Sequence, residues 1–308
     1  MDDKQFNAIL LTGDEGTIVQ ALRTAEDEGA LSLVKPMLAL LKHPNKAIVR
    51  QAIMSSANLI KTQLVSSWGD IEKNVKDGLA TILKRLNPAV VDRIADDLYS
   101  KDEENRLRTL QVLGLLGQDE KIKQSVSKML TDPDERMRAT AISILKNMLG
   151  HKDITIIYRV IQDPDPRVRA NGVETMEAVG NTNVISSLLK MRGDKNNRVR
   201  GNVLKALYSL GYKEIAGDLC KMLEDSNKWM RATAGWVLGE LGQVQEEPFL
   251  DLVGEYGIDR DPDVRQNMIK ALMKINNIKS LLYCKYLFPG TEIKQAHAAL
   301  ERMKKFRG

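Results

Sequence analysis

Three arginines stand at the same place in successive copies of a repeated sequence, and their chemistry suits them to bind an anion. They are Arg136, Arg167 and Arg198, each 31 residues after the last, and Trp229 follows in the same slot. A guanidinium group can donate two parallel hydrogen bonds to a phosphate or a carboxylate. An arginine in the first turn of a helix gains nothing from the helix dipole. An anionic partner is therefore one explanation for this column.

The arginine column has two interpretations. If it contacts phosphates, the protein binds nucleic acid through its backbone, and that binding must weaken steeply as salt is raised. The alternative is solvation or local pairing with neighbouring carboxylates, namely Asp134, Glu135 and Asp165.

A second set of residues is predicted to bind a protein or peptide partner. It consists of Trp229, Trp236, Asn171, Asn202, Asn267, Lys205 and Lys270. Asparagine is a poor residue for the middle of a helix, so something other than helix propensity accounts for it, and tryptophan is enriched at interface hot spots. Each has an alternative interpretation: the asparagines link neighbouring repeats, and Trp236 fills a gap in the core beside Gly235.

Residue types that would support catalysis are scarce or badly spaced. None of the three histidines, His43, His151 and His297, has a second histidine or a cysteine three or four residues away, so no metal site is expected. No phosphate-binding glycine loop or serine nucleophile motif occurs. Cys220 and Cys284 lie in apolar helical surroundings and are expected to be free thiols. The sequence predicts no catalytic residue and no cofactor.

These residues are positioned by an internal repeat. A phrase with an Asp, often a Pro, and an Arg six residues after the Asp recurs at 131–139, 162–170, 192–201, 224–232 and 259–265. This second arginine, which follows the slot of Arg136, stands at 138, 169, 200, 231 and 265, so the steps are 31, 31, 31 and 34 residues. A fixed step of this length is typical of stacked helical hairpins, whose function usually resides in an extended surface.

Each copy predicts two helices joined by a tight turn. The shorter helices are expected at 121–130, 153–161, 183–191, 213–223 and 248–256. The longer helices should bury large apolar residues at equivalent places, namely Leu145, Met176, Leu207, Leu238 and Leu272. We expect Asp163 to cap the longer helix of its copy, with Pro164 as the first helical residue.

The repeat resembles the HEAT repeat, especially the short bacterial form also found in phycobilin lyases. An aspartate stands six residues before an arginine in five successive copies: 132/138, 163/169, 194/200, 225/231 and 259/265. The resemblance implies that these side chains pair between adjacent repeats as a ladder. It also implies an all-α fold, a right-handed α-solenoid.

The resemblance raises three activities known from HEAT-like proteins. Deoxyhypusine hydroxylases hold iron with His-Glu dipeptides, and this sequence has none. Nothing in the sequence indicates the bilin site of a phycobilin lyase. DNA glycosylases of this architecture use an aspartate, an arginine and aromatic residues, and one repeat here holds Asp225, Trp229, Arg231 and Trp236. The aspartate and the arginine, however, already belong to the expected ladder.

The whole chain, 1–308, is predicted to be one solenoid. Residues 1–99 are divergent repeats, 100–276 are regular repeats and 277–308 are capping helices. The net charge of +5 allows an acidic partner or nucleic acid without identifying either. No apolar run reaches the roughly 20 residues that span a bilayer, and the polar start does not read as a signal peptide. We expect a cytoplasmic, bacterial protein that does not insert into membranes.

The function predicted from these features is that of a non-enzymatic scaffold or adaptor. It would bind a protein or peptide on the concave face formed by the longer helices. The alternative is nucleic-acid binding through the arginine column, including an activity like that of a DNA glycosylase.

Overall fold

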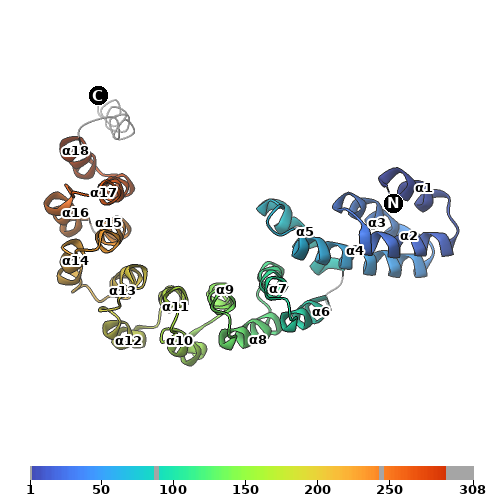
Figure 1. Cartoon of the computed structure of the whole chain (residues 1–308), viewed down its shortest axis with the longest axis horizontal. Coiled ribbons are helices and arrows are strands. Elements are labelled where there is room, and N and C mark those ends of the chain that lie inside the picture. Colours follow the sequence, from blue (N-terminus) through green and yellow to red (C-terminus); the bar gives the residue numbers. More distant parts are fainter. Residues whose placement is uncertain (1, 87–89, 243–245, 289–308) are drawn as a thin grey trace. The chain divides into compact units, whose positions relative to one another are not determined.

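The computed structural model describes residues 2–86, 90–242 and 246–288, and all its regular elements are helices (Figure 1). The chain divides into two compact units, Met1–Met148 and Leu149–Gly308. The α-helices of the first unit are α1 (Asp3–Thr12), α2 (Glu15–Glu28), α3 (Val34–Ala39), α4 (Lys46–Ser66), α5 (Lys73–Leu86), α6 (Val90–Asp96), α7 (Glu103–Leu116), α8 (Glu120–Lys128) and α9 (Glu135–Leu145). Those of the second are α10 (Ile154–Val160), α11 (Pro166–Val179), α12 (Ile185–Lys190), α13 (Asn197–Ser209), α14 (Ala216–Leu223), α15 (Lys228–Gly242), α16 (Glu246–Tyr256), α17 (Pro262–Ile275) and α18 (Ile278–Leu287).

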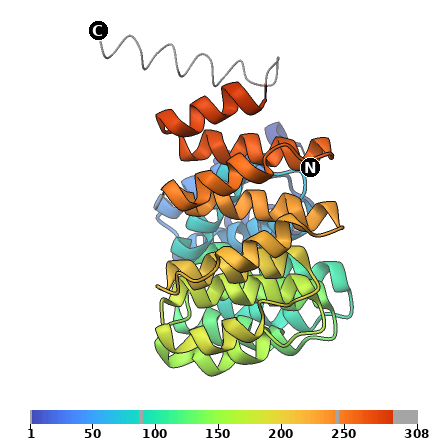
Figure 2. The same ribbon diagram turned by 90° about the vertical axis from the view of Figure 1, so that its left-hand side faces the viewer.

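The second unit is a regular stack of hairpins. Its even-numbered helices, α10 to α18, form one layer, and its odd-numbered helices, α11 to α17, form a second layer on the inside of the bend (Figure 1). Figure 2 shows the same helices stacked one above another. The all-α solenoid predicted from the repeat is confirmed. The continuity of one solenoid through both units stays a prediction, and the cap expected at 277–308 is described only as far as residue 288.

The apolar residues predicted for the longer helices form the core between layers. Leu145, Met176, Leu207, Leu238 and Leu272 all have side chains with no exposed surface. Small residues let neighbouring helices of the inner layer approach closely. A Cβ atom added at Gly239 of α15 would lie only 2.8 Å from Cα of Ala271 in α17. Helix-to-helix packing therefore depends on glycine at this position.

The turn before each longer helix is built one step differently from our expectation. The N-cap of α11 is Asp165, whose side chain accepts hydrogen bonds from the amides of Arg167 and Val168. Asp163, predicted as the cap, instead accepts from the amide of Asp165 and closes the turn that precedes the helix. The prediction was wrong by two residues because each aspartate of the Asp-Pro-Asp phrase accepts a different amide: Asp163 that of the turn and Asp165 those of the first helical turn. Both satisfy amides that would otherwise lack partners.

The second arginine of each phrase fastens this turn. Arg231 donates from Nη1 to the carbonyl oxygens of Asp225 and Ser226, at 2.8 and 3.1 Å. Its Nε and Nη2 atoms donate to the Asp259 carboxylate of the next repeat, at 2.6 and 3.0 Å. Both side chains are nearly buried, with 7% and 11% of their surface exposed. One guanidinium thus holds its own turn and the following repeat together.

The same pairing recurs between other repeats. Arg169 donates to Asp194 at 2.9 and 3.0 Å, and Arg106 lies 3.6 Å from Asp132. These pairs confirm the ladder that the sequence resemblance implied. Arg106 also donates to the carbonyl of Ser100, which stands where other copies have aspartate. The backbone half of the interaction therefore survives where the aspartate is missing.

Replacing the ladder arginine should destabilise the second unit strongly. Arg231→Met keeps the length of the side chain but leaves the buried Asp259 carboxylate unpaired, so we expect a loss of about 2–4 kcal/mol in the free energy of unfolding. Arg167→Met is the matched control, because this exposed arginine should contribute under about 1 kcal/mol. Denaturant unfolding of both variants measures the difference. Equal losses of unfolding free energy in the two variants would show that the ladder arginine stabilises the fold no more than an exposed arginine does.

The ladder should also give the stability a dependence on pH. Burial raises the pKa of Asp259, but hydrogen bonds from Arg231 and from the Asp261 amide lower it, and the net pKa lies below the ordinary 3.8. A lowered carboxyl pKa stabilises the fold above the unfolded pKa, and that gain is lost as pH falls through the folded value. The difference in unfolding free energy between wild type and Asp259→Asn should therefore be constant from about pH 7 to about pH 5 and shrink below pH 3.8. A difference that stays unchanged at low pH would contradict this assignment.

Candidate partner-binding surface

The two tryptophans predicted to bind a partner share one face of α15. They are seven residues apart, which is two helical turns, and 55% of Trp229 and 37% of Trp236 are exposed. Exposed tryptophans are uncommon, because their large apolar surface is usually removed from water. This pair lies on the inner layer of the second unit, where α15 stands between α13 and α17 (Figure 1).

Trp229 is held in place by polar neighbours. The Nζ atom of Lys228 lies 4.7 Å from the centre of its ring, within cation–π distance, and also pairs with Asp263 at 2.8 Å. From α13, the side-chain amide of Asn197 donates to the Trp229 carbonyl and to the Thr233 hydroxyl. Lys228 and Asn197 were not predicted, because neither occupies a distinctive slot of the repeat.

Trp236 is partly packed and partly exposed. A Cβ atom at Gly201 of α13 would lie 3.6 Å from Cζ3 of its ring and only 2.5 Å from Cγ2 of Thr233. One edge of the indole therefore lies beside α13 at Gly201, whose missing side chain makes room for Thr233. The gap beside Gly235 is filled by another residue, since a Cβ there would lie 3.1 Å from the sulfur of Met268. The remaining indole surface is available to a partner.

The asparagines of the predicted set link neighbouring helices. Asn202 is buried and donates to the carbonyl of Ala170 at 3.2 Å and to Glu174 at 2.9 Å. Asn267 makes the equivalent bond to the carbonyl of Ala232, also at 3.2 Å. Both bonds join successive helices of the inner layer, which is the inter-repeat alternative left open by the sequence. A role for these asparagines in partner binding stays a prediction.

The remaining members of the set lie on the same layer. Asn171 of α11 accepts from Arg198 through its side-chain oxygen at 3.0 Å, and Lys205 of α13 pairs with Glu177 at 2.9 Å. Lys270 of α17 is exposed and has no ion pair with any residue that the structure describes. The two tryptophans are therefore flanked by one lysine already paired within the chain and one that is not.

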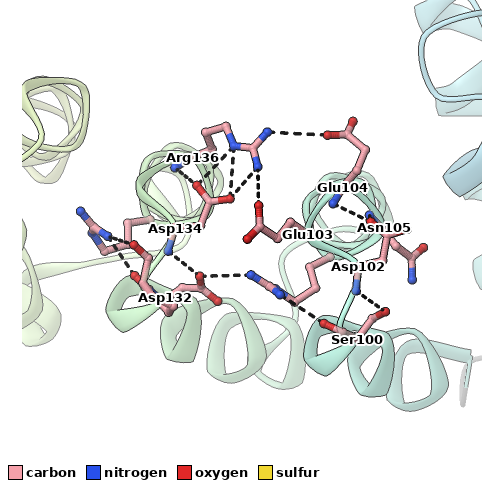
Figure 3. A network of polar contacts seen from close by, with 11 residues as sticks. Ser100, Asp102, Glu103, Glu104, Asn105, Asp132, Asp134 and Arg136 are labelled. Carbon is pink, nitrogen blue, oxygen red and sulfur yellow. Dashed lines mark hydrogen bonds and ion pairs between the residues drawn. The ribbon is translucent and has the colours of Figure 1, made fainter.

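The arginine column is already occupied by carboxylates. Arg136 bonds to Asp134 at 2.9 Å and to Glu103 at 3.3 Å, and Glu104 lies 3.8 Å away (Figure 3). Arg167 pairs with Asp165 at 3.0 Å. These are the local pairs of the alternative interpretation.

The third arginine of the column and two pKa shifts fit the same picture. Arg198 pairs with Glu174 at 3.2 Å. Hydrogen bonds from Arg136 and Arg167 lower the pKa of Asp134 and of Asp165, respectively, below the ordinary carboxyl value. All three arginines stay partly exposed, so phosphate binding by this column remains the alternative interpretation.

Other potential chemistry is limited within the described ranges. No group of three or more histidine, cysteine, aspartate or glutamate side chains there could hold a metal ion. Burial raises the pKa of the Cys284 thiol to about 11, which disfavours a reactive thiolate. Arg231 is buried in the ladder, so the glycosylase-like grouping of Asp225, Trp229, Arg231 and Trp236 does not share one exposed site. None of the described helices is long and apolar enough to cross a bilayer.

The sequence matches a family model described as HEAT repeats over residues 125–207, 154–239 and 185–256. No curated protein matches it. Among solved structures, the chain is similar to Kap121p bound to Pho4p, with 11% identity and a TM-score of 0.52 over 93% of this chain and 39% of that one. It is also similar to the CpcE–CpcF complex of phycocyanin lyase from Nostoc sp. PCC7120, with 16% identity and a TM-score of 0.44 over 80% and 94% of the two chains. Human deoxyhypusine hydroxylase aligns with 19% identity and a TM-score of 0.37 over 70% and 98%.

Nucleic-acid binding by the arginine column has a direct test. Because each guanidinium already has a carboxylate partner, we expect little binding of a fluorescent random DNA duplex or single strand, and no clear loss in the variant Arg136/Arg167/Arg198→Gln. Binding is measured by anisotropy across a salt series. Strong binding whose logarithm falls linearly with the logarithm of salt, and which the triple variant loses, would contradict this expectation.

Proposed function

Because residues 125–256 match the HEAT-repeat family model, we propose that the chain is a non-enzymatic scaffold that binds a protein or peptide on the inner, concave layer of its second unit. The observation that carries this proposal is the pair of exposed tryptophans on one face of α15, Trp229 and Trp236. Stacked helical repeats present long surfaces that suit extended partners. The fold of Kap121p, which is similar to this one, occurs in a complex with Pho4p.

The partner expected here is an apolar segment with polar flanks. Two indoles separated by two turns of α15 span about 10 Å, which is three residues of an extended peptide. Aromatic or aliphatic side chains of the partner would pack on the rings. Lys270, on the neighbouring α17, is exposed and can pair with a carboxylate of the partner.

The asparagines support this surface from beneath. Asn202 and Asn267 hold α13 to α11 and α17 to α15 by side-chain bonds to main-chain carbonyls. A surface whose backbone is fixed in this way loses little conformational entropy when a partner binds. We propose that their contribution to binding is this preorganisation, with the tryptophans making the direct contacts.

Peptides selected from a displayed random library against the wild-type chain test the proposal. Trp229→Ala together with Trp236→Ala should weaken the selected peptides by at least about tenfold, as expected for hot-spot residues. The helical melt should change little, because both rings are substantially exposed. The control is Tyr286→Ala, which removes a still more exposed aromatic, 72% accessible, from α18. Peptides that bind the double variant and the wild type equally well would refute the proposed surface.

A further inference from the structure

A basic hollow lies among the helices of the outer layer, between α12 and α14. Its volume is about 310 Å³, and it is lined by Leu189, Arg192, Gly193, Arg200, Asp218 and Lys221. Three of these six residues are cations and one is an anion. None of them belongs to the tryptophan surface of α15.

The same hollow occurs one repeat earlier with different chemistry. That hollow, of about 420 Å³, is lined by Tyr158, Ile161, Gln162, Ser187, Lys190 and Met191. Five of its six residues stand 31 positions before a residue of the basic hollow. Between the two, Ile161 is replaced by Arg192 and Ser187 by Asp218, while the lysine is kept. The fold thus builds the cavity in both repeats, and the second repeat places charges in it.

Arg192 departs from the residue type that this slot of the repeat favours. Three of the four other regular copies hold a large apolar residue there, Leu130, Ile161 and Leu223, and the fourth holds Gly257. The Arg192 guanidinium is held by Asp218 at 3.0 Å and by the carbonyl of Leu189 at 3.3 Å. An arginine that replaces a core-type residue and is fixed by two bonds is not explained by packing alone.

Arg200 departs from the ladder. Its counterpart Arg169 donates Nε and Nη2 to the carboxylate of Asp194, the aspartate of the next repeat. Arg200 donates Nε to the carbonyl of Asp194 in its own repeat, at 3.0 Å, and forms no ion pair within the described part of the chain. The aspartate that would pair with it, Asp225, accepts from the amide of Asn227, as Asp194 and Asp259 accept from the equivalent amides, but makes no ion pair with Arg200. The two terminal nitrogens of Arg200 therefore remain available to an external oxyanion.

We propose that this hollow binds a phosphate group, which replaces the carboxylate that Arg200 lacks. Asp218 balances Arg192, so Arg200 and Lys221 leave two uncompensated positive charges, which match a phosphate dianion better than a single carboxylate. A guanidinium fork donates two bonds to phosphate as it does to the aspartates elsewhere in the ladder. The lining of the earlier hollow has Lys190 as its one charged residue, so it serves as an internal comparison.

Calorimetric titration of the whole chain with inorganic phosphate tests the site. Arg192→Leu, which restores the residue of Leu130 and Leu223, and Lys221→Gln should each weaken binding by about tenfold. The control Lys190→Gln removes the equivalent lysine of the earlier hollow and should leave the affinity unchanged. The proposal falls if wild type shows no saturable binding, or if the control weakens binding as much as the two test variants.

The source of the phosphate is separated by a second ligand. Titration with phosphoserine in a short peptide, against the same peptide with serine, is compared with inorganic phosphate. Tighter binding of the phosphopeptide supports the site and assigns a phosphate carried by a protein. Equal affinities support the site and assign a free or small-molecule phosphate. Equal binding of both peptides, with no effect of phosphate, overturns the proposal.

The missing ion pair between Arg200 and Asp225 is tested without any ligand. Asp225→Asn keeps the oxygen that accepts from Asn227 and removes only the charge, so its melting temperature should match wild type. Asp259→Asn, the same change at an intact rung, should lower the melting temperature by several degrees. If both variants lose the same amount, Arg200 is paired with Asp225 in solution and the proposed site does not exist. These readouts are independent of peptide binding at the tryptophans, so each proposal can fail alone.

Discussion

The pairing of an arginine in one repeat with an aspartate in the next is the interaction on which the described stack depends. A guanidinium that is almost buried can be tolerated only if its donors are satisfied, and Arg231 uses two bonds for its own turn and two for the following repeat. Helix packing alone allows neighbouring hairpins to slide or rotate relative to each other. The directional bonds of the ladder fix their register.

A fixed register determines which side chains the inner layer presents. In the second unit, main-chain carbonyls of one long helix accept from asparagines of the next, and glycines such as Gly201 and Gly239 allow close approach. With these positions committed to the stack, few large apolar side chains remain at the surface of that layer. Trp229 and Trp236 are the conspicuous exceptions. The exposed apolar surface of their rings is unfavourable in water, and contact with a partner would remove it from water.

Much of this architecture follows from the sequence because the repeat offers several independent copies of the same signal. The step of 31 residues and the buried positions such as Met176 and Leu207 are set by local spacing, whereas the ladder pairs were expected from the resemblance to the HEAT repeat. The cap at Asp165 was misplaced at Asp163, since two aspartates two residues apart carry nearly the same signal and only the backbone path distinguishes them. The partners of Arg198 and of Asn202 lie in the preceding repeat, and one sequence does not contain the distances between repeats. Arg192 and Arg200 were missed for a related reason: the first stands in a core slot and the second in a ladder slot, and their shared hollow appears only when the helices are stacked.

The inner layer at α15 is proposed to be the surface where a partner binds. Replacing Trp229 with a photo-crosslinking aromatic amino acid, and separately replacing Tyr286 on α18, tests this proposal in the cell. We expect a discrete crosslinked protein from position 229 and none from position 286. Crosslinks of equal yield from both positions, or from position 286 alone, would contradict it.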